Sequence, residues 1–574
     1  MTNILNKFPF LLELFFNGTF ILFYSLNMAN NIPVSWDMDM VHIVLDVGTW
    51  LIPIVIFICL IFNYLQSEKF EVFFRKHIIS LVVFVPLVIT WGDQEFAFWL
   101  SCVHLLASIL SLYDEDAKES SDKKFRNTLL KLFALRPAQL VFLSFSGVIL
   151  IGTFLLALPL ASTGPKALSF IDALFTATSA TCVTGLSTIS TASDLSWFGQ
   201  GVVLILIQIG GLSIMTLYSS MAILLGKAMG MKERVVMQDL LDVASLDELF
   251  LMIVNIIKYT FFIELWGAII LTFAFSYEGF EFGESLYYGL FHSISAFCNA
   301  GFSLFDTSLQ SFATSPLITG TICVLITLGG VGFIVLRECR DAIINKRALV
   351  RLTLHTKIVL LTTLFLTVGG ALFIFFGEFV NGLEAYTLWE KIQVSIFQSI
   401  TLRTAGFNTI PMTNLHGYTL YGMTLFMFIG GSPGSTAGGV KTTTLSILVQ
   451  SIITTLKGKQ RVTIFDRNIP GPMVVRATAL TFIYILTISF FILVLMKLEP
   501  KQTFLPLFFE AVSAGATVGL TLGVTPSLSV LGKIFISLLM LIGRIGPLTL
   551  VLAVGGRIKE EGKFDYPDGR VLLG

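Results

Sequence analysis

A glycine motif that occurs four times constrains this chain more than any other feature of its sequence. The first copy is TCVTGL at Thr181–Leu186, and related stretches end at Gly301, Gly406 and Gly519. Each copy closes a short apolar segment and is followed, 24 to 28 residues later, by a second glycine inside a longer apolar run. These second glycines are Gly210, Gly329, Gly430 and Gly543. Such internal periodicity predicts an array of structural repeats.

Each copy is expected to form a pore hairpin. An apolar segment of roughly 12 residues is too short to cross about 30 Å of hydrocarbon, so the chain has to turn back inside the membrane. Irregular backbone is tolerated there only where protein buries it or where it lines a water-filled path. Glycine adopts backbone angles that other residues resist, and a ring of carbonyl oxygens can replace the water shell of a cation. Four such hairpins predict an ion pore.

Composition places the chain in a membrane. Of its 574 residues, 55% are hydrophobic and 13% charged, and the mean hydropathy is +0.84. The 37 basic and 37 acidic side chains balance, so the basic excess that suggests nucleic acid binding is missing. The six cysteines are scattered through apolar runs with no CxxC and no metal-ligand spacing. We expect buried free thiols.

The N-terminal part offers four apolar runs, of which the last two are marginal in length for a membrane span. They lie at about 8–28, 43–65, 78–91 and 95–112. Lysine and arginine gather between the second and third runs and in the segment Asp114–Ala138, whereas the other side carries acids only. The positive-inside rule therefore predicts that both termini are cytoplasmic. Glu13 interrupts the first run, which argues against a cleaved signal peptide.

The expected domains are an N-terminal accessory group of transmembrane helices, a charged cytoplasmic linker and a four-repeat pore domain. They comprise residues 1–113, 114–137 and 138–574, with repeats at about 138–235, 236–350, 351–465 and 466–574. Outer helices are predicted at roughly 140–160, 251–277, 357–378 and 473–497, and inner helices at roughly 198–225, 317–338, 418–456 and 528–555. The predicted fold is thus an all-α polytopic membrane protein with four helix–pore-hairpin–helix repeats around a central ion pore, preceded by about four extra N-terminal transmembrane helices.

Basic residues fill the loops between repeats, so these loops are predicted to face the cytoplasm and the hairpins to enter from outside. Acidic residues on the outer side could attract cations to the mouth, although ordinary solvated loops explain them nearly as well. These acids are Asp194, Glu278, Glu281, Asp306, Glu378 and Glu384.

The expected ion-selectivity filter consists of the four residues that end in each glycine, whose backbone carbonyls would bind the cation. These residues are Cys182, Val183, Thr184, Gly185, Cys298, Asn299, Ala300, Gly301, Arg403, Thr404, Ala405, Gly406, Ala516, Thr517, Val518 and Gly519.

Four side chains in or near the hairpins have two readings each. Arg403 places a guanidinium in an apolar segment, and Glu510 of the adjacent repeat is a possible partner, in structural bracing rather than in cation binding. His292 is expected to be a packing histidine with satisfied hydrogen bonds rather than a proton relay. Glu264 is either a helix-packing residue or lies at a different depth from the one its helix suggests.

The third inner helix contains six helix breakers between Gly430 and Gly439. Proline removes a backbone donor and glycine lowers helix propensity, so a non-helical loop is predicted at mid-membrane, below the filter; a helix kink is the alternative. Ser432, Ser435 and Thr436 can satisfy the freed backbone groups. The loop comprises Gly430, Gly431, Ser432, Pro433, Gly434, Ser435, Thr436, Ala437, Gly438, Gly439 and Lys441.

From Phe125 to the C-terminus the chain resembles the Trk/Ktr/HKT superfamily of potassium transporters, and most of all the bacterial Ktr-type membrane subunit. The motifs that carry the resemblance are TCVTGL, FCNAGF, RTAGFNT, TVGLTLG, IGGSPGSTAGGVKTT and GRIGPLT. The resemblance implies that glycine in all four copies accompanies potassium selectivity, that serine in the first copy accompanies sodium permeation, and that the broken loop is a gate. Cys182 departs from the hydroxyl or aliphatic residue expected there, and the first 120 or so residues lie outside the resemblance.

Arg544 stands where the other inner helices have the second glycine of a pair. The spacing puts its guanidinium at the depth of the loop, and an intramembrane arginine is first interpreted as functional. We name as its partners the loop carbonyls between Gly431 and Gly438, which an arginine fork can bind. An electrostatic barrier to the cation is the alternative.

The expected function is potassium uptake across the cell (inner) membrane by a multi-pass protein, with no covalent chemistry and no organic cofactor. A sodium-permeable or ion-coupled carrier on the same scaffold is the alternative. A membrane-embedded enzyme would need paired histidines or carboxylates facing a cavity, and the sequence shows none. The resemblance implies a homodimer that docks a separate cytoplasmic, nucleotide-binding regulatory ring, because this chain carries no GxGxxG-bearing soluble domain of its own.

Overall fold

The structure is a computed structural model, and it is mostly helical. It describes residues 12–21, 23–24, 38–66, 94, 97–98, 101, 104, 137–164, 167–212, 246–345 and 351–547. The chain forms two compact units. One comprises Met1–Leu135, Gly152–Ala173 and Ala192–Val202, and the other comprises Arg136–Ile151, Leu174–Thr191 and Val203–Gly574.

Four described helices are long and apolar enough to cross a membrane, and a bent pair of helices makes a fifth span if it is counted as one. The four segments are Val44–Ile61, Val254–Tyr277, Leu354–Glu378 and Gly471–Leu498. The last three match the predicted second, third and fourth outer helices. The protein is therefore a multi-pass membrane protein.

The first unit contains a helix over Leu12–Ile21 and the long helix α2 (Met38–Gln66), at the first and second predicted N-terminal runs. An apolar core that includes Phe20, Leu45 and Phe98 holds it together. Glu13 is buried in this unit, with its carboxylate 3.4 Å from Nε2 of His104. The third predicted run and the charged linker up to residue 136 lie outside the described residues.

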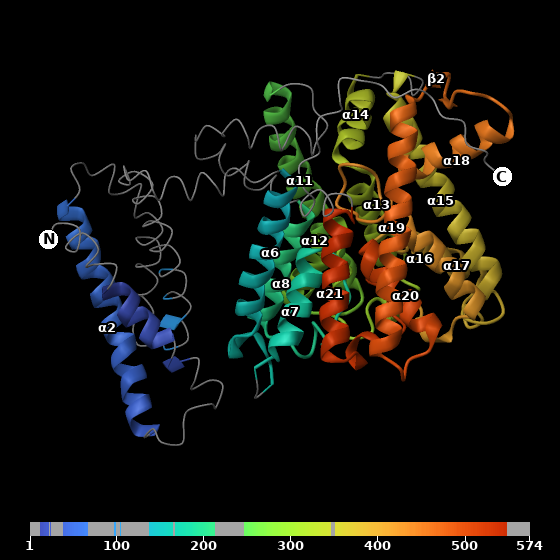
Figure 1. Ribbon diagram of the computed structural model, residues 1–574. Coiled ribbons are helices and arrows are strands. Elements are labelled where there is room, and N and C mark those ends of the chain that lie inside the picture. Colours follow the sequence, from blue (N-terminus) through green and yellow to red (C-terminus); the bar gives the residue numbers. More distant parts are fainter. Residues whose placement is uncertain are drawn as a thin grey trace. The chain divides into compact units, whose positions relative to one another are not determined.

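In the remaining chain, each long helix is followed by two or three shorter ones (Figure 1). They are α6 (Pro137–Leu156), η1 (Pro159–Ala161), α7 (Phe170–Thr181), α8 (Trp197–Gly211), α11 (Leu246–Tyr277), α12 (Phe282–Phe297), η2 (Gln310–Phe312), α13 (Pro316–Val331), α14 (Phe333–Ile344), α15 (Leu354–Glu378), α16 (Leu388–Thr401), η4 (Met412–Asn414), α17 (Gly417–Phe428), α18 (Thr442–Leu456), α19 (Gly471–Leu498), α20 (Phe504–Ala516), η5 (Thr525–Ser527) and α21 (Val530–Ile545). Strands β1 (Thr463–Ile464) and β2 (Arg467–Asn468) pair antiparallel between α18 and α19.

Two predicted inner helices are interrupted. The second, predicted over 317–338, breaks after Val331, and α14 leaves α13 at an angle of 106°. The break lies at Gly332, whose φ of 96° is open to glycine but strained for other residues. The fourth, predicted over 528–555, breaks after Ile545, where Gly546 adopts the same conformation with φ 91°; its predicted part beyond residue 547 lies outside the described residues. The part of the first inner helix beyond Leu212 lies outside the described residues.

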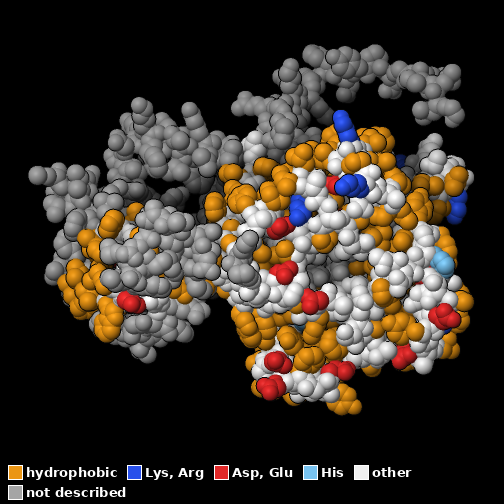
Figure 2. All heavy atoms as spheres, turned by 90° about the horizontal axis from the view of Figure 1, so that it is seen from below, with side chains coloured by type: hydrophobic (Ala, Val, Ile, Leu, Met, Phe, Trp, Pro, Cys, Tyr) orange, Lys and Arg blue, Asp and Glu red, His pale blue; other side chains and the backbone are white. Residues whose placement is uncertain are grey.

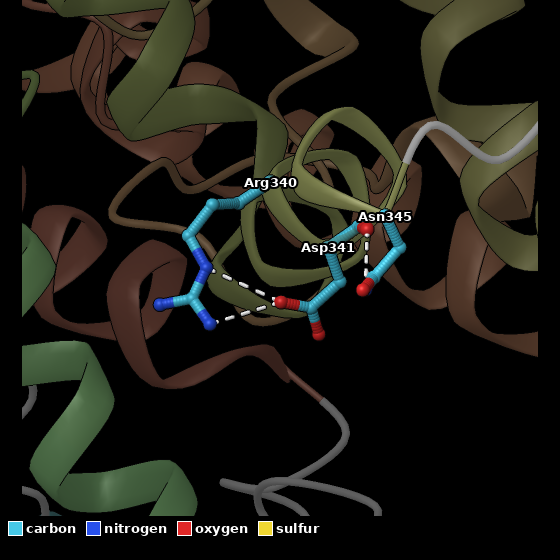
Figure 3. Close-up of polar contacts among 3 residues, drawn as sticks. All are labelled: Arg340, Asp341 and Asn345. Carbon is cyan, nitrogen blue, oxygen red and sulfur yellow. Dashed lines mark hydrogen bonds and ion pairs between the residues drawn. The ribbon is translucent and has the colours of Figure 1, made fainter.

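The far end of α14 is polar and is held by its own side chains (Figure 3). The guanidinium of Arg340 donates to the Asp341 carboxylate at 2.9 and 3.2 Å, and Asn345 donates to the Asp341 carbonyl at 2.8 Å. A groove of about 300 Å³ separates this end of α14 from the start of α15. Across it, Glu338 accepts from the backbone N–H and the hydroxyl of Thr353, which caps α15.

Candidate ion site

Four short helices, α7, α12, α16 and α20, each end just before one copy of the glycine motif. In every copy the residue two before the glycine is left-handed: φ is 56° at Val183, 60° at Asn299, 63° at Thr404 and 55° at Thr517. The glycine itself is also at positive φ in all four copies, between 73° and 94°. Non-glycine residues adopt this conformation rarely, so its recurrence at equivalent positions shows that the four segments share one backbone path.

Hydrogen bonds to the preceding short helix hold this path. The backbone N–H of Thr184, Ala300 and Val518 each donates at 2.8 Å to the carbonyl five residues back, at Ser179, Ser295 and Ser513. In the third copy Ala405 donates to Thr401, four residues back, at 3.0 Å. The hydroxyls of Ser179 and Ser513 also accept from Gly185 and Gly519, at 3.1 and 3.0 Å. The segments are therefore fixed in place by their own helices.

The four glycines form a closed ring. A methyl group added to Gly185 would stand 2.5 Å from the Ala300 carbonyl oxygen, and one added to Gly301 would stand 2.7 Å from that of Ala405. At Gly406 the methyl group would stand 2.7 Å from the Val518 carbonyl oxygen, and at Gly519 it would overlap the carbonyl of Thr184 in the first copy. Each contact joins one copy to the next, and the fourth joins the first. No pattern in the sequence indicates which copies are neighbours in the ring.

The second glycines are explained by direct packing against the ends of the short helices. A methyl group at Gly210 would overlap the Thr181 carbonyl, one at Gly329 the Phe297 carbonyl, and one at Gly543 the Gly515 carbonyl. In each case the inner helix lies with its backbone against the last carbonyls of the short helix of its own copy. The spacing of 24 to 28 residues is thus the length of chain that returns from the ring to this contact.

The third copy differs, because Gly430 packs against Gly438 of its own loop. Helix α17 ends at Phe428 and α18 begins at Thr442, so the chain between them is non-helical, as the sequence predicted, and the kink alternative is wrong. Gly430 N–H and Val440 N–H donate to the carbonyls of Val440 and Phe428, at 3.0 and 3.2 Å. These bonds close the base of the loop.

The loop is bound to the inner helix of the second copy. Thr436 donates from its backbone N–H to Gly329 at 3.3 Å and from its hydroxyl to Phe297 at 3.2 Å, and Ser432 N–H donates to Gly330 at 3.0 Å. Phe333 N–H, the first in α14, donates to Gly434 at 3.1 Å. A methyl group at Gly332 would stand 2.8 Å from the Pro433 carbonyl oxygen. The break between α13 and α14 therefore lies where the loop packs.

Two cationic side chains contact the loop. Lys441 donates from Nζ to the Ala437 carbonyl at 2.7 Å. The guanidinium of Arg544, near the end of α21, donates to the Thr436 carbonyl and to the Gly210 carbonyl at the end of α8. Thr436 lies within the range named from the sequence, whereas Gly210 was not foreseen because no sequence pattern relates α21 to α8.

Arg403 and Glu510 do not pair. Both are described and buried, yet no ion pair joins them; Glu510 instead accepts from the hydroxyls of Thr521, at 2.8 Å, and Thr525. His292 is fully buried, with Nδ1 2.8 Å from the Tyr288 carbonyl and Nε2 3.0 Å from the Ser303 hydroxyl. It is a packing histidine with satisfied hydrogen bonds, as predicted.

The face opposite to α14 carries acidic side chains (Figure 2). Glu390 closes a capping box at the start of α16, where hydrogen bonds from the N–H and hydroxyl of Thr387, both 2.8 Å long, lower the pKa of Glu390. Glu378, which the sequence placed among the acids at the mouth, is fully buried instead.

Glu378 and Glu499 occupy equivalent positions, at the end of an outer helix, and each accepts a hydrogen bond from the start of the next inner helix. This arrangement was not predicted from the sequence. Glu378 accepts from His416 N–H at 2.9 Å, and Glu499 from Ser529 N–H at 2.7 Å. His416 and Ser529 are the N-cap residues of α17 and α21. The sequence feature that could have indicated it is a glutamate at the end of the outer helix in both the third and the fourth copy.

Among the described residues, five cysteines are free thiols, as expected; Cys59, Cys182 and Cys298 are buried, whereas Cys323 and Cys339 are only partly buried. No group of three or more His, Cys, Asp or Glu side chains among these residues could hold a metal ion. In the ring, backbone carbonyl oxygens lie beside each glycine. Such oxygens suit a weakly held alkali cation.

The family model described as "TrkH: Cation transport protein" matches residues 134–561, which is most of the chain. The chain belongs to the TrkH cation transport protein family. The match includes all four glycine segments, the broken loop and Arg544.

Relatives of the TrkH family agree with this assignment. The chain is 38% identical over 453 residues to the Ktr system potassium uptake protein B of Bacillus subtilis, covering 78% of this chain and 99% of that protein. It is 37% identical over 450 residues to the potassium/sodium uptake protein NtpJ of Enterococcus hirae, covering 77% and 98%. The solved potassium transporter TrkH from Vibrio parahaemolyticus has the same fold, with a TM-score of 0.59 at 18% identity, over 89% of this chain and 97% of that one.

Proposed function

We propose that this protein takes up potassium across the cell membrane through a pore built from four repeats, with the glycine ring as its selectivity filter. The closed ring carries the proposal, since each glycine lies against a carbonyl of the next copy and no side chain fits between them. Carbonyl oxygens crowded in this way can replace the hydration shell of a cation. Potassium is the transported substrate, and no organic cofactor has a part in this proposal.

The alternative, a carrier that also admits sodium, is favoured by one comparison, the relative named as a potassium/sodium uptake protein. Glycine at position 185 in the first copy favours potassium, because the family resemblance associates glycine there with potassium selectivity and serine with sodium permeation. We therefore retain potassium as the main substrate.

The loop between α17 and α18 is proposed to be the gate. It lies between the ends of α13 and α21, with Thr436 hydrogen-bonded to both Phe297 and Arg544. Irregular backbone at this depth fits a segment that lines a water-filled path. Its hydrogen bonds hold it in one position, and release of the Arg544 contact would free it.

The proposed assembly is a homodimer in the inner membrane, with both termini in the cytoplasm and a separate nucleotide-binding ring docked on the cytoplasmic face. Support comes from relatives named as parts of Ktr systems. Residues 1–113 are proposed to be accessory helices and 114–137 a linker, because the family match begins only at residue 134.

Uptake of radioactive potassium, with sodium in competition, by cells that lack other potassium uptake systems tests the main proposal. Wild type should restore uptake that excess sodium does not suppress. Gly301→Ala, whose methyl group would stand 2.7 Å from the Ala405 carbonyl oxygen, should lose it. Gly320→Ala, in α13 with open space around the new methyl group, is the matched control. Failure of expressed wild type to take up potassium would reject the function.

A further inference from the structure

Glu264 is a buried carboxyl to which the proposed pore gives no role. It lies in α11, in the middle of the membrane-spanning segment Val254–Tyr277, and is 3% exposed. Among the described residues, no lysine or arginine forms an ion pair with it. An ionisable group at this depth is costly and is a candidate for function.

Two side chains contact this carboxyl, and a third contacts the backbone of the same residue. Gln208 of α8 donates from Nε2 to Oε2 of Glu264 at 3.1 Å. The Cys298 thiol, directly after α12, lies 3.8 Å from the other carboxylate oxygen and 3.6 Å from Oε1 of Gln208. Ser293 of α12 also donates to the backbone carbonyl of Glu264 at 2.6 Å. The carboxyl therefore joins α8 to the base of the second glycine segment.

The last turn of α8 is the element that these contacts share with the loop. Gly210, two residues after Gln208, accepts from Arg544, which also binds the loop carbonyl of Thr436. Gly211 lies directly on the second segment, since a methyl group there would stand 2.5 Å from Sγ of Cys298. One turn of helix is thus held from α11 through Glu264 and from α21 through Arg544.

We propose that Glu264 is a positioning residue for conduction, an inference that rests on the proposed function. Through Gln208 it fixes the turn of α8 whose Gly210 carbonyl Arg544 holds, and through Cys298 it fixes the start of the second filter segment. Loss of the carboxyl then weakens the hold of Arg544 on the closed loop and loosens the ring. Flux rises and selectivity falls, the opposite of what a folding defect does to flux.

The direction of the hydrogen bonds is part of this role. Oε2 of Glu264 accepts from the amide N–H of Gln208, which keeps the amide oxygen turned toward the Cys298 thiol. Arg544 reaches the same turn of α8 from α21, through the Gly210 carbonyl.

Full-length protein in proteoliposomes, at matched protein content and melting temperature, tests the inference. Glu264→Ala should raise basal potassium flux roughly three- to tenfold, the range that corresponds to the loss of one hydrogen bond, and should lower the potassium-to-sodium ratio. The exchange Glu264→Gln with Gln208→Glu rebuilds the pair in reverse and should return both values toward wild type. Glu284→Gln, an exposed carboxyl on α12, is the matched control and should change neither.

The inference is overturned if folded Glu264→Ala conducts and selects like wild type, or if the exchange restores neither value. If Glu264→Ala does not fold, Glu264→Gln alone decides, because it keeps the size of the side chain. It replaces one accepting oxygen by an amide donor, so basal flux should rise and the potassium-to-sodium ratio should fall; values equal to those of wild type contradict the proposal. Absence of potassium flux in wild type would reject the proposed function instead.

Discussion

The glycine ring and the layer beneath it are built from the same four copies, but only the ring is uniform. In the ring, both left-handed positions recur in all four copies, and each glycine meets the next copy in the same way. Beneath it, α13 bends by 106° at Gly332, α21 stops at Gly546, and the third copy replaces helix by a loop. Repetition is kept in the ring, where the proposed filter needs four equivalent segments around one ion, and it is lost one layer below.

The difference fits two separate proposed roles, ion selection in the ring and gating in the layer beneath it. A ring of equal carbonyls requires equal backbone paths, because one displaced copy would change the distance from the ion to all the others. The proposed gate requires only one element that can take two positions, and the irregular third copy is the segment proposed for it. The other inner helices form the surfaces against which that loop packs.

The largest effect is expected at the contact between the two layers. Gly329→Ala would drive a methyl group into the Phe297 carbonyl, whereas at Gly330, one residue later, the nearest atom is the flexible Asn299 amide at 3.3 Å. Because backbone atoms can move aside only at a large cost in free energy, Gly329→Ala should destabilise the fold by about 3 kcal/mol or more. Gly330→Ala should destabilise it by under about 1 kcal/mol. Thermal unfolding of the two purified variants checks this, and equal melting temperatures would contradict it.

Within the ring, Gly185→Ser is expected to admit sodium. Its Cβ would stand 2.5 Å from the Ala300 carbonyl oxygen, and the φ of 94° at this position is strained for serine, so the ring has to widen or loosen. The potassium-to-sodium permeability ratio, measured at equal expression, should fall. An unaltered ratio would remove Gly185 from the filter.

In the layer beneath, Arg544→Gln is expected to raise basal flux. One charge about 8 Å from the ion path, at an effective dielectric of about 20, opposes a cation by about 2 kcal/mol, or about thirtyfold in occupancy. Loss of the fork to Thr436 would act in the same direction by freeing the loop. Flux no higher than wild type would make Arg544 a structural brace.

Arg544→Lys separates these two causes, because it keeps the charge and loses the fork. A latch predicts high flux from the lysine variant and little further gain when the loop is also shortened, since both changes act on one contact. A charge barrier predicts flux near wild type and separate gains. Potassium flux in the two single variants and the double variant distinguishes them.

The smallest effect is expected outside both layers. A chain that begins near Ser120 keeps every element of the ring and of the layer beneath it, so it should conduct like wild type if it inserts correctly. Potassium uptake by the truncated protein, with its membrane insertion verified, is the measurement. Loss of transport in a folded truncation would make the N-terminal helices part of the mechanism.

The sequence by itself determined the four glycine copies, the four outer helices and the interruption of the third inner helix. These are local properties, since apolar length and glycine and proline content act over a few residues. Proline and glycine in the stretch around Pro433 strongly disfavour a regular helix. The contact of Arg544 with a loop carbonyl could be predicted from the sequence, because the spacing of the repeats also indicates how deep a residue lies in the membrane.

Only the tertiary structure decided which copies touch. The order of the glycines around the ring, the bend at Gly332, the Gly210 carbonyl held by Arg544 and the position of Glu264 beside Cys298 join residues far apart in the chain. The partners of Glu510 show the limit most clearly, because charge suggested Arg403 while the fold supplied the hydroxyls of Thr521 and Thr525. A sequence pattern indicates that a buried polar residue requires a hydrogen-bond partner, but packing decides which of several suitable partners comes within hydrogen-bond distance.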